Sequence, residues 1–363
     1  MSAAAPLVSP HAHEATSIAR TMGWVMLALT PATLFGLVQF GWPAIFLFTV
    51  TLLTAVVAEA VCLRLANKPV RAHLLDGSAV LTGWLLALTL PPWAPWWIGV
   101  VGALIAIVIA KQIYGGIGQN LFNPAMVARV ALLIAFPLEM TQFVPPLPLF
   151  SGSAPELMSG LAITFGTPPA PFDGLSGATV LDQVRTAIDQ GASFPESLPG
   201  DYNPLAGGLG TVAGSMGETS ALLLLAGGML LLYVRVIRWP IPVAMLGSIA
   251  LLAGLMHLLD PGRYADPLYH LVSGATLLGA FFIATDLVTS PVSQRAQLVY
   301  GALCGVLIYV IRTWTHYPEG VAFAVMLGNA AVPLLDQWLR PRIYGRDRRG
   351  RPLAVPPTRE DQA

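Results

Sequence analysis

Residues 22–40, MGWVMLALTPATLFGLVQF, and residues 44–65, AIFLFTVTLLTAVVAEAVCLRL, decide the class of fold. Each is an apolar run of about the 20 residues that an α-helix needs to cross about 30 Å of hydrocarbon. Over the 363 residues, 55% are hydrophobic and 10% are charged, whereas about a quarter of residues are charged in a soluble domain. The mean hydropathy is +0.68. The sequence therefore predicts an all-α polytopic membrane protein.

Apolar runs recur along the chain in two groups of five. The others cover 79–90, 96–110, 126–136, 221–236, 241–259, 268–284, 298–311 and 321–335. We therefore expect ten transmembrane helices in two halves, residues 21–137 and 218–338, separated by a loop over 138–217. Residues 1–20 are expected to form a cytoplasmic lead without the pattern of a cleavable signal, and residues 339–363 a basic cytoplasmic tail.

Basic residues gather in alternate loops and in the tail. They are Arg64, Lys68, Arg71, Lys111, Arg235, Arg238, Arg295, Arg340, Arg342, Arg346, Arg348, Arg349 and Arg351. The positive-inside rule places these segments and both termini in the cytoplasm. The 138–217 loop is acidic except for Arg185. This loop is therefore predicted to be periplasmic, and the chain to be a multi-pass protein of the inner (cytoplasmic) membrane.

An odd number of spans in each half makes the two halves run in opposite directions. Any relation between the halves is then an inverted repeat, as in many transporters. Three residues of the third span match three of the eighth at one constant offset: Leu81, Gly83 and Thr89 against Leu277, Gly279 and Thr285. This match favours two inverted five-helix repeats with broken helices near a central axis.

Residues 115–125, GGIGQNLFNPA, form a polar stretch between the fourth and fifth spans on the cytoplasmic side. The glycines permit close backbone approach, and Pro124 suits the first turn of a helix whose amides are free to meet a ligand. Asn120 and Asn123 both donate and accept hydrogen bonds, which suits the edge of an uncharged heteroaromatic ring. The alternative is a re-entrant turn that satisfies only its own backbone. Two further polar stretches, 214–220 and 285–291, are read either as helix caps or as parts of a site.

Two charges fall inside predicted spans, Glu59 in the second and Arg129 in the fifth. A charge at such depth is costly unless it is paired or faces water, so we treat Glu59 as a candidate for ion or proton handling. Either side chain could instead snorkel to the interface. Cys62 and Cys304 lack metal-ligand spacing, and His257, His270 and His316 show no metal-ligand grouping. No metal site is therefore predicted, and nothing in the sequence indicates a nucleic-acid partner.

The outer loop contains a short segment, residues 173–179 with the sequence DGLSGAT, that suits covalent modification. A threonine hydroxyl in a segment flanked by glycines can be esterified by a phosphoryl group when an enzyme docks the exposed peptide. Residues 273–276 repeat the tetrapeptide SGAT but lack the acidic lead and begin a membrane span. Thr276 is therefore predicted to stay unmodified, and Thr179 to be the modified residue.

The 173–179 segment resembles the recognition motif of the flavin transferase that links FMN through its phosphate to threonine. The motif residues are Asp173, Gly174, Ser176, Gly177 and Ala178, followed by the acceptor Thr179. The runs ending at Ala125, Ser220 and Pro291, together with the RPRIYG sequence of 340–345, resemble the D subunit of the Rnf electron-transport complex. A relative of that protein is the B subunit of the sodium-pumping NADH:quinone reductase. Leu287 is a departure, since many relatives have proline there.

The resemblance implies a urea-transporter-like fold with covalent FMN on Thr179 and noncovalent riboflavin near Asn120 and Asn123. It implies electron transfer between ferredoxin and NAD coupled to translocation of sodium or protons, with no complete reaction by this chain alone. The implied partners are an outer FMN-carrying subunit, cytoplasmic iron–sulfur and flavin subunits, the flavin transferase and membrane lipid. The alternatives are a small-solute channel or transporter on the same scaffold, and a structural anchor for redox partners.

Overall fold

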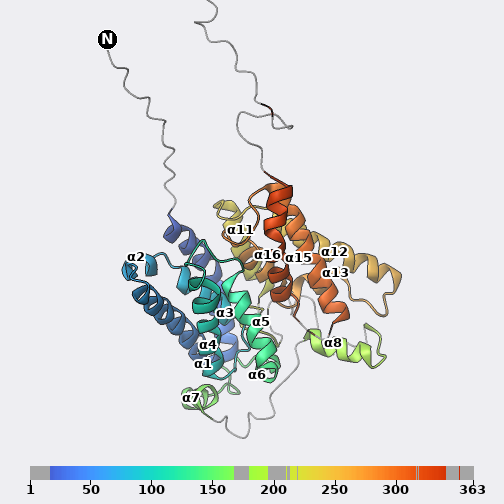
Figure 1. Cartoon of the computed structure of the whole chain (residues 1–363). Helices are drawn as coiled ribbons and strands as arrows, with labels where there is room; N and C mark the ends of the chain where they lie inside the picture. Colours follow the sequence, from blue (N-terminus) through green and yellow to red (C-terminus); the bar gives the residue numbers. More distant parts are fainter. Residues whose placement is uncertain are drawn as a thin grey trace, which may run out of the picture.

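The computed structural model describes residues 17–166, 180–194, 210, 213–218, 220–315, 317, 319–340 and 351. These residues form a helical bundle, and no β-strand occurs among them (Figure 1). His316 and the predicted flavin-attachment segment lie outside the described residues. That segment comprises Thr179 and the motif residues Asp173, Gly174, Ser176, Gly177 and Ala178.

The first half begins with α1, Ile18–Leu65, a 48-residue helix interrupted at Gly41, whose φ is +73°. A straight helix of this length would extend about 72 Å at 1.5 Å per residue, more than twice the thickness of the hydrocarbon. The break at Gly41, followed by Pro43, divides α1 into the two helices that the sequence predicted. The other helices of this half are α2 (Val70–Leu74), α3 (Ser78–Thr89), α4 (Trp96–Leu104), the π-helix η1 (Ile105–Gln112) and α5 (Pro124–Ala135).

The second half contains three long helices and a span that is divided in two. Its helices are α11 (Ala221–Tyr233), α12 (Pro240–Leu259), α13 (Pro267–Val272), α14 (Thr276–Leu278), the π-helix η3 (Gly279–Ile283), α15 (Gln294–Trp314) and α16 (Val321–Trp338). The predicted eighth span is divided between α13 and the α14–η3 segment, with Gly274 between them at φ +64°. Breaks of this kind are tolerated at membrane depth where protein surrounds them.

Four helices are long and apolar enough to cross a membrane: α1, α12, α15 and α16. Shorter apolar helices occupy 78–89, 96–112, 124–135 and 221–233. The chain is therefore a multi-pass membrane protein, as its composition predicted. The count of ten transmembrane helices, their inverted repeat and the urea-transporter-like arrangement remain predictions, as do the five segment boundaries.

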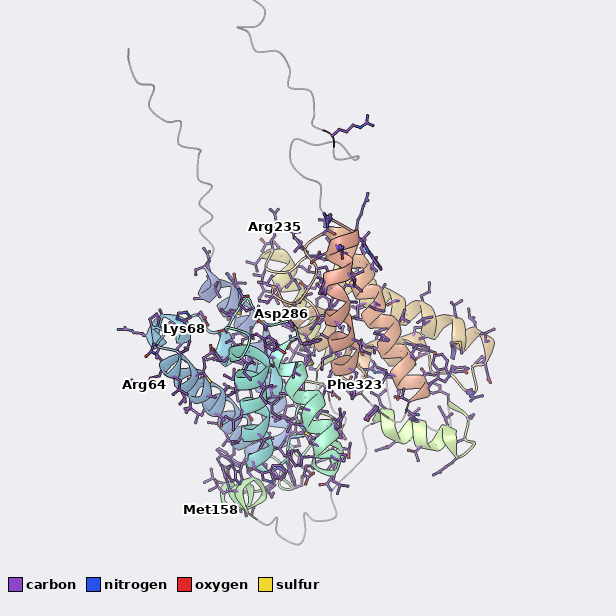
Figure 2. All side chains as sticks on the ribbon, in the orientation of Figure 1. Arg64, Lys68, Met158, Arg235, Asp286 and Phe323 are labelled. Carbon is purple, nitrogen blue, oxygen red and sulfur yellow. The ribbon has the colours of Figure 1, made fainter. Side chains whose placement is uncertain are left out.

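The outer loop contains helices that its sequence did not lead us to expect: α6 (Pro137–Thr141), α7 (Leu157–Phe165) and α8 (Val180–Asp189). Lys68 and Arg235 lie toward one end of the bundle, and Met158 of α7 lies at the other (Figure 2). The basic loops and the helices of the acidic loop therefore occupy opposite ends. Lys111 is an exception to the predicted set of loop cations, because it is buried inside η1.

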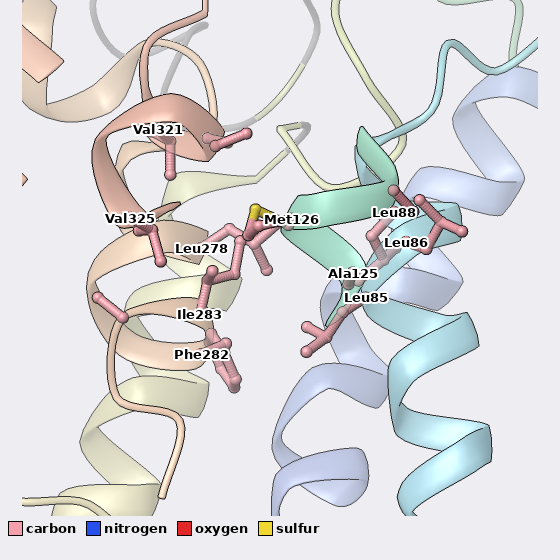
Figure 3. Packing of buried hydrophobic residues seen from close by; sticks show 14 of the residues in the cluster. Leu85, Leu86, Leu88, Ala125, Met126, Leu278, Phe282, Ile283, Val321 and Val325 are labelled. Carbon is pink, nitrogen blue, oxygen red and sulfur yellow. The ribbon is translucent and has the colours of Figure 1, made fainter. Parts of the chain in front are cut away.

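Contacts between α5 and α16 and between α1 and α11 join the two halves. Their interface is apolar, with Met126 of α5 beside Leu278 and with Ala125 beside Leu85 of the same half (Figure 3). The backbones approach closely where α11 crosses α1, since a Cβ at Gly227 would overlap the Ala28 carbonyl. This apolar interface separates the two polar ends of the molecule.

Candidate functional site

Asn123 lies where α5 begins, at the end of the bundle that carries the basic loops. Its Oδ1 accepts from the N–H groups of Ala125 and Met126 at 3.1 and 3.4 Å. Its Nδ2 donates to the carbonyl of Ile283 at 3.4 Å. The side chain therefore caps α5, where an asparagine is among the favoured residues, and also ties this half to the other. Asn123 is one of the two residues predicted to bind riboflavin, but both ends of its side-chain amide already form hydrogen bonds within the protein.

Asn120 is more open to a ligand. Its Nδ2 donates to the carbonyl of Phe122 at 3.2 Å, while its Oδ1 has no donor among the described residues. Asn120 and Asn123 line one cavity together with Lys111 and Asp286. The structure therefore brings the two asparagines together at one cavity, and their binding of riboflavin stays a prediction.

The volume of this cavity limits what it holds in the present conformation. It measures about 80 Å³, below the roughly 300 Å³ at which ordinary ligand pockets begin. Its polar groups suit the edge of a flavin ring, but its volume does not accommodate the three fused rings. Binding there would require the apolar lining, which includes Leu81 and Phe282, to move apart.

Glu59 forms a buried ion pair with Lys111. The Lys111 Nζ lies 2.7 Å from Oε2 and 2.9 Å from Oε1 of Glu59, and both side chains are 3% exposed. The same ammonium donates to the hydroxyl of Ser78 at 2.7 Å, and Gln112 donates to Glu59 Oε1 at 2.9 Å. Burial excludes snorkelling for Glu59. The predicted candidate for ion handling is thus neutralised by a cation that the sequence analysis had placed in a loop.

A second cluster of charges lies at the opposite end of the interface. Arg129 of α5 is 4% exposed and donates to the sulfur of Met140 at 3.6 Å. It lines two small cavities together with Glu218 and Glu319. Arg312 of α15 donates to Glu319 at 3.2 Å. Arg129 is therefore buried beside carboxylates and does not snorkel to the surface.

The two carboxyl groups of this cluster differ in proton affinity. Burial, followed by the negative charge of Glu319, raises the pKa of Glu218 to about 8. Burial also acts to raise the pKa of Glu319. The positive charge of Arg312 and the hydrogen bond from the Ala275 N–H have the larger effect, so the pKa of Glu319 is lowered. Glu218 is therefore the more readily protonated of the two carboxyl groups.

The second copy of the SGAT tetrapeptide is enclosed by this cluster. Thr276 is fully buried, and its hydroxyl accepts from Arg312 Nη1 at 2.8 Å. The same hydroxyl lies 2.9 Å from the carbonyl of His270. A transferase has no access to this oxygen, in agreement with the prediction that Thr276 is unmodified.

Several polar residues have structural explanations. Ser220 caps α11 by accepting from the N–H of Leu223 at 3.3 Å, and Asp286 accepts from Thr289 at 3.1 Å in its own turn. Cys304 is buried, whereas Cys62 is only partly buried. No cluster of three or more metal-ligating side chains occurs in the described part of the chain.

Sequence reasoning missed Glu319 and Arg312 as site residues. Both lie next to the ends of apolar runs, where a charge has the ordinary explanation of facing the membrane surface. Nothing in the sequence near Arg312 distinguishes it from an interfacial charge, because it directly follows the apolar run 298–311 and lies in the last turn of α15.

Replacing Glu59 by glutamine leaves the Lys111 ammonium buried without its counterion. We expect the Glu59→Gln protein to lose about 3–5 kcal/mol of stability, seen as a lower unfolding temperature in detergent. The double variant Glu59→Gln/Lys111→Met removes both charges and should recover most of the loss. Glu156, whose carboxylate is exposed, supplies the control Glu156→Gln. An equal loss in the single and double variants would contradict the ion pair.

The proton on Glu218 predicts how stability depends on pH. Its pKa rises from 4.5 to about 8 on folding, so between these values the native state holds a proton that the unfolded chain releases. Stability should therefore fall as pH rises through this window. Thermal unfolding at a series of pH values should show a flatter dependence in Glu218→Gln than in the wild type or Glu156→Gln. An unchanged slope in Glu218→Gln would rule out this assignment.

Comparison with known proteins gives a consistent relationship over nearly the whole chain. The chain matches the family described as "NQR2, RnfD, RnfE family" over residues 7–345. It is 54% identical over 349 residues to the D subunit of the ion-translocating oxidoreductase complex of Halorhodospira halophila (strain DSM 244 / SL1), with 96% of this chain and 98% of the relative covered.

Two further relatives carry the same name. The protein of Stutzerimonas stutzeri is 55% identical over 340 residues, covering 94% of this chain and 96% of the relative. That of Rhodobacter capsulatus is 51% identical over 306 residues, covering 84% and 85%. The resemblance to the Rnf complex protein, inferred from the sequence motifs, is thereby confirmed: the chain belongs to the NQR2, RnfD, RnfE family.

Proposed function

We propose that this chain is a membrane subunit of an Rnf-type ion-translocating electron-transport complex that transfers electrons between ferredoxin and NAD. It carries FMN covalently on Thr179 at the outer side and riboflavin noncovalently near Asn120. The family and the names of the relatives support membership of such a complex. The 173–179 sequence supports the covalent flavin.

One observation supports the proposal: the cavity that Asn120 lines and the cavity that Arg129 lines share no residue and lie at different parts of the bundle. Leu181 follows Thr179 by two residues in the sequence. The Leu181 side chain packs on Gly274 and lines a cavity with Arg129. Asn120 lines the cavity at the other end. The apolar side chains of Figure 3 lie between these ends.

When bound, a flavin supplies one- and two-electron redox chemistry that no amino-acid side chain in this interface offers. The chain's own residues position such groups and keep water out. Met126, Leu278 and Ile283 are fully buried in the interface between the halves, so this part of the interface is closely packed. The same packing speaks against the alternative of an open small-solute channel.

The partners belong to the proposal as well. A subunit that carries electrons from one side to the other requires a donor and an acceptor at its two ends. We assign these roles to an outer FMN-carrying subunit and to cytoplasmic iron–sulfur and flavin subunits. A flavin transferase would act on the outer loop during maturation. The coupled ion is sodium or a proton.

Covalent attachment is tested at a single residue. In the wild type, mass spectrometry of the peptide containing Thr179 should show an added FMN mass, because the phosphate remains esterified after denaturation. The Thr179→Val protein should lose flavin fluorescence from its band in a denaturing gel. The peptide with Thr276 provides the internal control and should keep its unmodified mass. A fluorescent Thr179→Val band would contradict the assignment of Thr179 as the attachment residue.

Riboflavin binding is tested at the two asparagines separately. Asn120→Ala removes the free Oδ1 acceptor, and the riboflavin released by acid should fall severalfold relative to covalent flavin in the same sample. Asn123→Ala should instead cost about 1 kcal/mol through loss of the helix cap, whereas Asn123→Ser keeps the cap. Normal riboflavin content in a folded Asn120→Ala protein would contradict the role given to Asn120.

A further inference from the structure

The backbone N–H of Asn123 is bound by the other half of the molecule. It donates to the side-chain oxygen of Asn329, in α16, at 3.0 Å. The other link from Asn123 to the second half, from its Nδ2 to the carbonyl of Ile283, is longer at 3.4 Å. Hydrogen bonds from nitrogen to oxygen are most often about 2.9–3.0 Å long, so the bond to Asn329 is the firmer of the two. Asn329 therefore fixes the residue that caps α5.

Asn329 is buried, and its own amide is held in one orientation. Only 2% of the residue is exposed. Its nitrogen donates to the hydroxyl of Tyr300 at 2.8 Å and to the carbonyl of Val325 at 3.2 Å. The opposite orientation would turn the amide nitrogen toward the Asn123 N–H, donor against donor, and would lose that bond. The partners of the nitrogen therefore direct the oxygen toward Asn123.

Close packing of α15 against α16 keeps Tyr300 in place. Tyr300 is fully buried. Its ring lies against Gly328, where a Cβ would come within 2.9 Å of the ring and within 2.7 Å of the Cys304 sulfur. Glycine permits this close approach because it has no Cβ. The hydroxyl of Tyr300 is therefore fixed beside the amide of Asn329.

A link between α15 and α16 alone would not need the oxygen of Asn329. Burying an amide without hydrogen bonds is costly, and Tyr300 and Val325 satisfy only its nitrogen. The oxygen is used across the interface, on Asn123 of the first half. The first N–H groups of a helix have no partner within the helix, so they need an acceptor from elsewhere. The geometry therefore indicates a role at the start of α5 as well as between α15 and α16.

Asn120 lies on a loop that is anchored at both ends. At the start of the loop, Lys68 Nζ donates to the carbonyl of Gly115 at 2.8 Å. At its end, Asn123 is held by Asn329. Between these anchors the side chain of Asn120 bonds locally, to the carbonyl two residues farther along, at 3.2 Å. The place of Asn120 in the cavity wall therefore depends on the two anchors.

We propose that Asn329 is a positioning residue for the ligand site at Asn120: by holding the N–H of Asn123, it sets where the loop presents Asn120. Tyr300 supports this role by orienting the Asn329 amide. Neither residue is among the described residues that line the cavity, so both act through Asn123. The inference rests on the proposed binding of riboflavin near Asn120. A binding residue needs such support from residues that are themselves locked by packing.

The role of Asn329 is tested in the full-length protein purified in detergent. The quantity measured is the rate at which noncovalent riboflavin leaves, followed by filtering off free flavin at timed intervals. Asn329→Leu keeps the branched shape of the side chain but removes the acceptor. It should raise the rate about tenfold, because leaving a buried donor unpaired costs roughly the 1.4 kcal/mol that corresponds to this factor. Asn329→Asp keeps an oxygen that faces Asn123 and should stay near the wild-type rate.

The chain offers a milder variant and matched controls. Tyr300→Phe should raise the release rate about threefold, in keeping with the loss of one hydrogen bond. Tyr309 is a buried tyrosine on the same helix, outside the described lining of the cavity, so Tyr309→Phe should release riboflavin at the wild-type rate. Thr33→Val removes the acceptor of Trp84 Nε1, now 2.8 Å away. It should lower the unfolding temperature without changing the rate.

The outcomes separate this inference from riboflavin binding itself. Wild-type release rates in both Asn329→Leu and Tyr300→Phe, with riboflavin lost from Asn120→Ala, would overturn the role of Asn329 alone. Equal acceleration by Asn329→Leu and Asn329→Asp would do the same, because the acceptor would not matter. If Asn329→Leu does not fold, equal rates in Tyr300→Phe and Tyr309→Phe decide against the inference. Wild-type protein without noncovalent flavin would overturn both this role and the riboflavin site.

Discussion

The cost of burying a charge is the constraint that organises this protein. The bundle has an apolar interior, yet Lys111 and Glu59 lie in it with 3% of each side chain exposed. Moving such groups out of water costs several kcal/mol per ion unless geometry and hydrogen bonds compensate. Here the ammonium has three acceptors, two on Glu59 and one on Ser78. The pair fixes α1, the start of α3 and η1 to one another.

A buried cation at the other end of the molecule, Arg312, is also stabilised by a carboxylate and a hydroxyl. Arg312 of α15 donates to Thr276, the first residue of α14, and to Glu319. Lys111 likewise lies near the end of the fourth apolar run of its half and donates to Ser78, the first residue of α3. In each half, a buried cation at the end of the fourth run therefore donates to the hydroxyl of the first residue of a helix in the third span. This correspondence, at opposite ends of the bundle, supports the predicted inverted repeat independently of the three-residue match.

The helices were largely predictable from sequence, and the site was predictable only in part. Apolar runs of sufficient length identified the helices, including the break in α1, because burial in lipid depends on composition and length. Pairing between distant charges has no such local signal. Lys111 resembled a loop cation because it directly follows an apolar run. Its partner Glu59 is 52 residues away in the sequence, and only the fold brings the two side chains together. Helix α8 of the 138–217 loop was not predicted because it is short and amphipathic, and a helix of that kind contains no long apolar run.

The two ends of the interface differ in a way that bears on how each would hold a flavin. The cavity between α8, α13 and the end of α15 measures about 430 Å³, and the cavity beside Asn120 about 80 Å³. A roomy cavity at the surface lets a noncovalent ligand leave, and a covalent tether offsets this by keeping the ligand at high effective concentration. A tight apolar site retains its ligand by enclosure once the lining has opened and closed around it. The small volume beside Asn120 therefore favours a noncovalent ligand held by enclosure, as the proposal for riboflavin requires.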